Sequence, residues 1–213
     1  MTTTLILDFD GTLANTTNLI VKTLQETLTT EKYPTRSFEE CAATIGLPLS
    51  EAFKILANVN DARADELATI YRRIFAVNNV PGAVTLYPTV KETLLALKNK
   101  GIRLTIATSR ARPSLEVLLE DLEILDLISY TLTGLEVPKS KPAPDMVIHT
   151  MDHFNLKKEE CIVVGDAKVD ILMGHNAGVK AIAVNYGNGS EEDLKTANPE
   201  QIISEFAQIL NFI

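Results

Sequence analysis

Short apolar runs alternate with amphipathic segments over most of this chain, and the alternation predicts strands connected by helices. The runs that read as buried strands are residues 4–7, 103–107, 161–164 and 181–184, with a weaker one at 130–132. Helices are expected between them, one with Pro113 in its first turn and two others closed by Gly101 and Gly178. We therefore expect an α/β fold with a doubly wound parallel sheet.

Residues 15–84 interrupt this alternation with a pattern that is helical throughout. Apolar side chains at helical spacing form two stripes, Ile20, Leu24 and Leu28 in the first and Leu67, Ile70, Tyr71, Ile74 and Val77 in the second. Ser37 to Glu40 reads as a capping box, and Ser50 and Asp61 read as N-caps. The segment is expected to end in a turn at Pro81-Gly82.

These patterns divide the chain into a core and an insert. Residues 1–14 and 85–213 are expected to form the α/β core, and residues 15–84 a helical cap domain. Near the end of the chain, Pro199 is expected to open a C-terminal helix. Ligands of doubly wound sheets bind at the carboxyl ends of the strands, so the residues that follow each strand are the candidates for chemistry.

Composition narrows the class of protein. The 213 residues are 46% hydrophobic and 23% charged, and the net charge of −8 argues against a nucleic-acid-binding surface. No apolar run is long enough to span a membrane, and we expect no secretory signal. Two distant cysteines, Cys41 and Cys161, support neither a disulfide framework nor a cysteine metal site. We expect a cytoplasmic protein with no nucleic-acid or membrane partner.

Polar residues follow four of the predicted strands. Asp8 and Asp10 end the first strand, where residues i and i+2 share a face, and their like charges favour a cation between them. Gly11 then permits a turn. The residues that follow the other three strands are Thr108, Ser109 and Arg110, then Lys139, Ser140 and Lys141, then Asp166 and Asp170. Because parallel strands end at one edge of a sheet, we expect these groups to converge.

Each of these groups also has a purely structural interpretation. Helix capping is the alternative for Thr108, Ser109 and Asp166, and a solvated surface charge is the alternative for Arg110, Arg112, Lys139, Lys141 and Asp170. The pair Asp166 and Asp170 argues against that alternative, because like charges four residues apart destabilise a helix by roughly 0.2–0.5 kcal/mol. The histidines follow no strand and are assigned packing or surface roles: His149, His153 and His175.

The residue types at the strand ends suit one kind of chemistry. Carboxylates from two strand ends make an oxygen-only site, which favours Mg²⁺ over zinc. A hydroxyl group and an ammonium group beside such a site suit an incoming phosphoryl group. One aspartate would attack phosphorus, and the other would move protons. The strand ends therefore predict a magnesium-dependent phosphoryl-transfer site.

Four motifs in sequence order carry a resemblance to a known family. They are DFDGT at residues 8–12, LTIATSR at 104–110, KSKPAPD at 139–145 and VGDAKVD at 164–170. The chain resembles the haloacid dehalogenase (HAD) superfamily of phosphohydrolases, in the C1-capped subfamily I branch, which has a helical cap inserted after the first motif. A softer similarity, carried by residues 46–49 and 177–187, is to phosphoglycolate-phosphatase-like and pyrophosphatase-like members.

The resemblance implies a role for each motif residue. Asp8 would be the nucleophile that forms an aspartyl-phosphate, and Asp10 would protonate the leaving group and then activate water. Mg²⁺ would be held by the Asp8 and Asp166 carboxylates and by the Asp10 backbone carbonyl. The phosphate would be bound by Thr108, Lys141 and the backbone N–H of Ser109. Asp170 would order metal-bound waters or Lys141.

The resemblance also implies that the cap closes over the site and selects a small phosphorylated metabolite. A phosphoglycolate-like acid is the first candidate for this substrate, and pyrophosphate or a sugar phosphate is the second. The residues that would reach the substrate are Gly46 to Ser50, Arg63 and Arg72, each with a structural or solvated role as the alternative. Asn15 stands where relatives often carry Asp, which is a difference at the hinge.

Three other functions share part of the pattern. β-Phosphoglucomutases are similar in the first motif and at Thr16, but they carry a histidine where Ile20 stands, which favours hydrolysis over isomerisation. True dehalogenases lack an aspartate at the position of Asp10. A phospho-acceptor regulatory domain also combines acidic residues, a threonine and a lysine with Mg²⁺. Such a domain does not place its acceptor on the first strand, however, or carry a helical insert.

Overall fold

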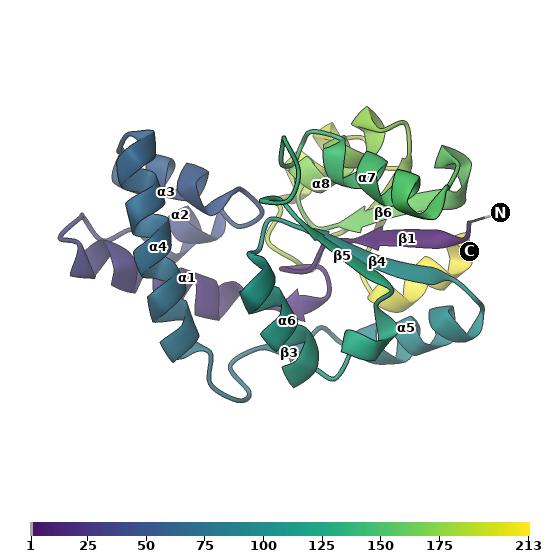
Figure 1. Cartoon of the computed structure of the whole chain (residues 1–213), viewed down its shortest axis with the longest axis horizontal. Helices are drawn as coiled ribbons and strands as arrows, with labels where there is room; N and C mark the ends of the chain where they lie inside the picture. Colours follow the sequence, from purple (N-terminus) through teal and green to yellow (C-terminus); the bar gives the residue numbers. More distant parts are fainter. Residues whose placement is uncertain (1) are drawn as a thin grey trace.

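A computed structural model describes residues 2–213 and contains a six-stranded parallel sheet in the order β5-β4-β1-β6-β7-β8 (Figure 1). Its strands are β1 (Thr4–Leu7), β4 (Arg103–Thr108), β5 (Tyr130–Thr133), β6 (Cys161–Gly165), β7 (Lys180–Val184) and β8 (Gln201–Ile203). The central strands are buried apolar runs, as expected for a sheet covered on both faces. The predicted doubly wound α/β fold is confirmed.

Helices cover both faces of this sheet. Alternate residues of β1 explain why, because Leu5 and Leu7 pack in one apolar core and Ile6 packs in another. The first core includes α5 (Val90–Asn99), α6 (Arg112–Asp121) and the 3₁₀ helix η3 (Phe206–Phe212). The second includes α7 (Asp145–Phe154), α8 (Lys168–Asn176) and α9 (Glu191–Thr196). Short 3₁₀ turns, η1 (Leu125–Leu127) and η2 (Lys158–Glu160), precede β5 and β6.

Strand register places the ends of the three central strands at one edge. Leu7 of β1 pairs with Ile106 of β4 on one side and with Val164 of β6 on the other. The next residue, Asp8, keeps its backbone N–H on the carbonyl oxygen of Val164 at 2.8 Å. The residues after these strands therefore emerge together, which is what brings distant parts of the sequence to one site.

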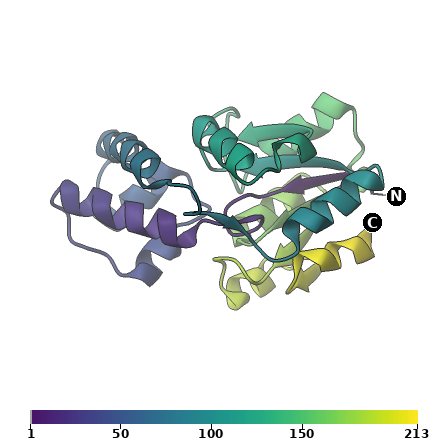
Figure 2. The ribbon, with the colours of Figure 1, turned by 90° about the horizontal axis from the view of Figure 1, so that it is seen from below.

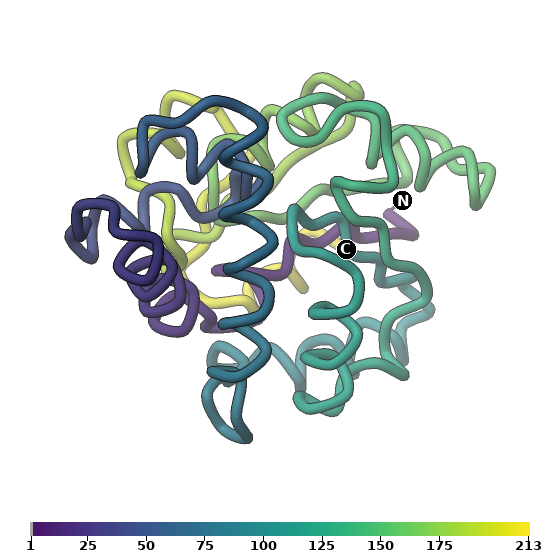
Figure 3. The backbone as a smooth tube through the Cα atoms, turned by 60° about the vertical axis from the view of Figure 1, so that its left-hand side comes forward, coloured from purple at the N-terminus to yellow at the C-terminus, as the bar shows by residue number. Residues whose placement is uncertain are grey.

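Four helices between β1 and β4 form an insert at the end of the molecule opposite the two chain termini (Figure 2). They are α1 (Thr17–Thr30), α2 (Phe38–Ala42), α3 (Leu49–Ala57) and α4 (Asp61–Asn78). Figure 3 views the molecule with this purple-to-blue insert brought forward. Many of its apolar residues are buried, among them Leu24, Phe53 and Leu67, and Phe53 meets Tyr71 edge-on at a ring distance of 6.1 Å.

The chain enters and leaves the insert through a two-stranded antiparallel ribbon. This ribbon consists of β2 (Ala14–Asn15) and β3 (Thr85–Leu86), in which Asn15 pairs with Thr85. The predicted division of the chain at residues 14/15 and 84/85 falls in this ribbon. Within residues 2–213, no helix is both long enough and apolar enough to cross a membrane.

Several local predictions are confirmed and others are wrong. The Ser37 capping box forms, and Pro113 lies in the first turn of α6. The two predicted N-caps Ser50 and Asp61 are wrong. Helix α3 already starts at Leu49, and α4 is capped by Asn60, whose side chain accepts the Arg63 N–H at 3.0 Å.

The segment after Pro199 begins with a strand, and the predicted C-terminal helix is replaced by β8 followed by η3. Glu200 explains the strand, because its backbone N–H donates to the Ala181 carbonyl and its carboxylate accepts the Ala181 N–H at 2.6 Å. These bonds attach the segment to β7, and the β-branched Ile202 and Ile203 then extend the sheet.

Candidate active site

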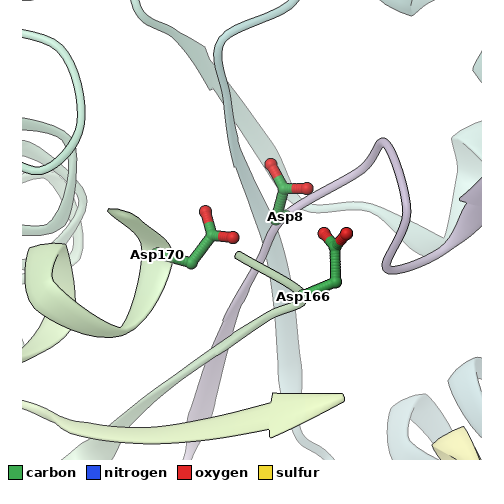
Figure 4. Close-up of side chains that lie close together, drawn as sticks. All are labelled: Asp8, Asp166 and Asp170. Atoms are coloured by element: carbon green, nitrogen blue, oxygen red, sulfur yellow. The ribbon is translucent and has the colours of Figure 1, made fainter. Parts of the chain in front are cut away.

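Three aspartates meet at the carboxyl edge of the sheet. Asp8 follows β1, Asp166 follows β6, and Asp170 lies in the first turn of α8 (Figure 4). All three are buried, with at most 5% of their surface exposed, and one ligand oxygen from each lies within 4.8 Å of the others. Gly11 is required here, because its φ is +87° and a Cβ atom at this position would approach Asp166 Oδ2 to 2.2 Å.

Lys141 supplies a buried positive charge to this group. Its ammonium nitrogen donates to Asp8 Oδ1 at 2.5 Å and to Asp170 Oδ1 at 2.6 Å, and its side chain is 0% exposed. Burial disfavours the ammonium, but the charges of Asp170 and Asp8 outweigh it and raise the pKa of Lys141 above its ordinary value. The predicted contact between Asp170 and Lys141 is therefore present in the structure.

Negative charge in the group exceeds the positive charge that faces it. Burial and, to a smaller extent, the charge of Asp170 raise the pKa of Asp166 to about 7. Hydrogen bonds from the Asn188 N–H at 2.7 Å and from Thr12 at 3.0 Å act in the opposite direction and lower this pKa. Burial also raises the pKa of Asp8 well above its ordinary value, although Lys141 opposes the shift. Three carboxylates thus share one ammonium, and this excess together with the oxygen-only donor set fits a divalent cation. The arrangement is consistent with a metal site.

The Asp10 side chain lies outside this group of three and forms an ion pair that the sequence did not reveal. Its carboxylate accepts hydrogen bonds from Arg110 Nη2 at 2.5 Å and Nε at 2.9 Å, and from Thr16 Oγ1 at 2.6 Å. The separation from Asp8 has a simple cause, since β1 ends at Leu7 and the strand pleat no longer aligns residues beyond it. The backbone carbonyl of Asp10 stays a predicted metal ligand.

Arg110 is a buried residue, and the surface-charge alternative is wrong for it. Its side chain is 7% exposed, donates to Ser114 Oγ at 2.6 Å and lies 4.7 Å from the centre of the Phe75 ring of α4. Its position directly after Thr108 and Ser109 was the available signal, because that position lies at the same sheet edge as the aspartates. Arg112 is more exposed and bonds Glu136 and Thr131.

Thr108 and Ser109 both line the space above Asp8. Thr108 is buried and its hydroxyl oxygen accepts the Arg110 backbone N–H at 3.1 Å. The Ser109 hydroxyl donates to the Gly46 carbonyl at 2.7 Å, which joins the core to the insert. The predicted phosphate contacts of these two residues remain predictions, and for Ser109 the predicted donor is the backbone N–H.

A cavity of about 700 Å³ lies between the core and the insert and reaches Asp8 and Asp10. Residues 46–50 and Arg72 line it, and their contact with a substrate stays a prediction. Arg63 is engaged elsewhere, in hydrogen bonds to Glu31 and Glu66 within the insert. The histidines keep packing or surface roles, since His149 and His153 stack on Tyr130 and His175 lies 3.6 Å from Glu200.

Comparison with known proteins agrees with this geometry. Residues 5–184 match the family described as haloacid dehalogenase-like hydrolase. The protein named "Probable phosphatase IndB" from Dickeya dadantii is 34% identical, over 96% of this chain and 90% of that protein. The pyrophosphatase PpaX of Bacillus anthracis is 31% identical, over 97% of this chain and 94% of that protein.

Solved structures show the same fold over the whole chain. The crystal structure of a "predicted phosphoglycolate phosphatase" from Haemophilus somnus 129PT superposes with a TM-score of 0.88 at 26% identity. The match covers 99% of this chain and 97% of that one, so the helical insert is included. The motifs, the sheet with its insert and the family match lead to one conclusion: the chain belongs to the haloacid dehalogenase-like hydrolases.

Proposed function

We propose that this protein hydrolyses a small phosphomonoester in a Mg²⁺-dependent reaction, with Asp8 as the nucleophile. The observation that carries the proposal is the buried group of Asp8, Asp166 and Asp170 around Lys141 at the carboxyl edge of the sheet. The family match and the phosphatases among the relatives support it. No other set of the described residues combines a buried carboxylate group, an ammonium and an adjoining cavity.

In this proposal the metal is Mg²⁺, held by the Asp8 and Asp166 carboxylates and the Asp10 backbone carbonyl. Hard carboxylate and carbonyl oxygens are the ligands this ion prefers. When bound, Mg²⁺ supplies positive charge that offsets the charge of the phosphoryl oxygens near Asp8. Asp170 has a supporting role, because its carboxylate accepts a second hydrogen bond from the Lys141 ammonium at 2.6 Å.

The chain's own groups divide the chemistry between them. Asp8 Oδ attacks phosphorus and the ester P–O bond breaks. For this step Asp10 leaves its ion pair with Arg110, carries a proton and gives that proton to the departing alkoxide. Asp10 then takes a proton from a water molecule that attacks the aspartyl-phosphate, which releases phosphate and restores the Asp8 carboxylate. Thr108, the Ser109 N–H and Lys141 hold the phosphoryl oxygens during both steps.

The insert, residues 15–84, acts as a cap in this proposal. Its helices form one wall of the cavity above Asp8, and the β2–β3 ribbon is the connection about which it would move. Closure would exclude water while Asp8 attacks and would place insert residues on the leaving group. The prediction that residues 46–50 and Arg72 reach the substrate belongs to this role.

The substrate candidates come from the resemblance and the relatives. A phosphoglycolate-like acid is the first guess, in keeping with the structure from Haemophilus somnus. Inorganic pyrophosphate is the second candidate, because the relative from Bacillus anthracis is named a pyrophosphatase. Sugar phosphates, with or without residual mutase activity, are the remaining class. A phospho-acceptor regulatory domain is the alternative outside the enzymes.

Phosphate release from a panel of phosphomonoesters, with and without Mg²⁺, tests the proposal. We expect turnover that depends on Mg²⁺ and that falls by roughly a thousandfold or more in Asp8→Asn, because loss of a nucleophile removes the covalent route. Asp65→Asn is the matched control, since Asp65 is an exposed carboxylate of α4 and its loss should leave turnover unchanged. Substantial activity in Asp8→Asn would overturn the assignment, and a long-lived phosphoprotein without turnover would favour the regulatory alternative.

A further inference from the structure

Much of the cavity lining away from the aspartates is apolar, and this feature narrows the class of substrate. We propose that the leaving group is an apolar alcohol, aliphatic or aromatic, so that the preferred substrates are phosphate monoesters with one phosphoryl group and an uncharged hydrocarbon body. This inference rests on the proposed function and identifies its substrate class. It disfavours phosphoglycolate, pyrophosphate and sugar phosphates as the preferred substrates.

One wall of the cavity is formed by hydrocarbon side chains of the insert. We call this set the apolar wall: Ile20 and Leu24 of α1, Leu47, Leu49 of α3, and Phe75 of α4. These side chains come from three helices and the loop before α3, so the insert contributes an apolar surface to the cavity. An apolar group of a substrate that packs here removes its own surface and that of the protein from water, which favours binding in proportion to the area buried.

The core side of the cavity also presents apolar side chains, and these are exposed. Leu135, which follows β5, is 72% exposed, and Val117 of α6 is 48% exposed, and both line the cavity. Exposed apolar side chains are ordinary when scattered, but these two face the apolar wall across one hollow. A hydrocarbon leaving group would cover them.

The cavity offers few cationic side chains that could pair with a second anionic group of a substrate. Among the described residues that line it, the charged ones are Asp8, Asp10, Arg72 and Arg110. Arg110 is already paired with Asp10, and Arg72 is exposed on α4, where an ion pair contributes little. The carboxylate of phosphoglycolate or the second phosphoryl group of pyrophosphate would therefore lose water without gaining a buried cation.

Hydroxyl-rich substrates meet a similar difficulty. Three of the hydroxyl groups that line the cavity are committed within the protein, Thr44 to the Cys41 carbonyl, Ser109 to the Gly46 carbonyl and Ser114 to Arg110. Sugar hydroxyls that lie against the aliphatic and phenyl side chains of the apolar wall would lose their bonds to water, because these side chains offer no hydrogen-bond partner. The volume agrees, since about 700 Å³ is in the range of cavities that hold larger organic ligands.

A matched pair of esters tests the inference: n-pentyl phosphate and the phosphate ester of ω-hydroxypentanoate, which has the same chain length and ends in a carboxylate. We expect kcat/KM to be roughly tenfold or more higher for the pentyl ester, because burial of an unpaired carboxylate is unfavourable. From ethyl to pentyl phosphate, kcat/KM should rise by up to roughly fourfold for each added methylene. Equal values, or a preference for the carboxylate ester, phosphoglycolate or pyrophosphate, would overturn the inference.

A charge placed in the cavity should change the preference. Leu135→Lys adds an ammonium at an exposed position, so the fold should tolerate it, and we expect the ratio of kcat/KM between the two esters to shift toward the carboxylate ester by roughly two- to fivefold, the effect of an exposed ion pair. Val77→Lys is the matched control, because Val77 of α4 is 78% exposed and does not line the cavity. An unchanged ratio in Leu135→Lys, or an equal shift in Val77→Lys, would contradict the inference.

The experiment separates this inference from the proposed function. If no phosphomonoester is hydrolysed with Mg²⁺, the proposed function fails and the inference fails with it. If hydrolysis occurs and depends on Asp8, but charged or hydroxyl-rich substrates are preferred, the inference alone fails.

Discussion

Removal of the Lys141 charge by Lys141→Met tests the electrostatics on which the site depends. Met is close to Lys in volume, so the change chiefly deletes an ammonium that contacts Asp8 and Asp170 and is 0% exposed. Breaking a buried ion pair by removing one partner costs about 3–5 kcal/mol, because the remaining charge is buried without compensation. In the metal-free protein at pH 8 we expect the variant to lose about this much free energy of unfolding.

The loss should shrink as the pH falls. Burial and Asp170 raise the pKa of Asp166 to about 7 even in the unsubstituted protein, and without Lys141 the carboxyls retain protons more readily still. The native state then binds more protons than the unfolded chain, so its stability increases with decreasing pH. Each proton that the variant binds beyond those of the unsubstituted protein restores about 1.4 kcal/mol per pH unit. One such proton recovers about 2.8 kcal/mol between pH 8 and pH 6, which is more than half of the expected loss.

Urea unfolding followed by circular dichroism at pH 8 and pH 6, with and without Mg²⁺, measures these differences. Lys139→Met is the matched control, since Lys139 is exposed two residues earlier and should change the free energy of unfolding little. Saturating Mg²⁺ should stabilise Lys141→Met more than the unsubstituted protein, because the ion replaces the missing positive charge. A Lys141→Met protein that is as stable as the control at pH 8 would refute the reasoning, and so would a loss independent of pH.

Two further predictions concern the metal and the insert. Protons compete with the ion for Asp166, whose pKa is about 7 without metal, so Mg²⁺ affinity should weaken as the pH falls from 8 to 6. Titration calorimetry measures this affinity, and an affinity that stays constant over this range would contradict the assignment of Asp166 as a metal ligand. Phe53→Ala removes a ring that is 0% exposed in the insert, and urea unfolding should show a loss of about 3–5 kcal/mol. A loss below about 1 kcal/mol would mean that the insert repacks around the change.

The strands and their ends were predictable because their signals are local. The runs at β1 and β6 are almost wholly apolar, which is the mark of a strand buried on both faces, and each is followed at once by an aspartate. The rule that parallel strands end at one edge then brings Asp8 and Asp166 together without any knowledge of contacts. The same rule brings Lys141 and Asp170 to this edge, and the roles of these two residues followed from the family motifs.

Pairings across long sequence distances were not predictable. Arg110 meets Asp10 across 100 residues, and the bond depends on where β1 stops and how the insert covers it, which no local pattern contains. The contact between Ser109 and Gly46 joins two domains in the same way. The strand β8 was misread because a proline before a polar segment also suits a helix start, and only the bonds of Glu200 to Ala181 distinguish the two.

Covalent capture on Asp8 tests the central proposal most directly. With p-nitrophenyl phosphate the leaving group needs no proton, so Asp10→Asn should still form the aspartyl-phosphate but should hydrolyse it slowly. Rapid mixing with Mg²⁺ should release one p-nitrophenolate per site in a burst, and mass spectrometry of the acid-quenched protein should place one phosphoryl group on the peptide that contains Asp8. A phosphoryl group on any other residue, or turnover with no modified peptide at any time point, would contradict the account.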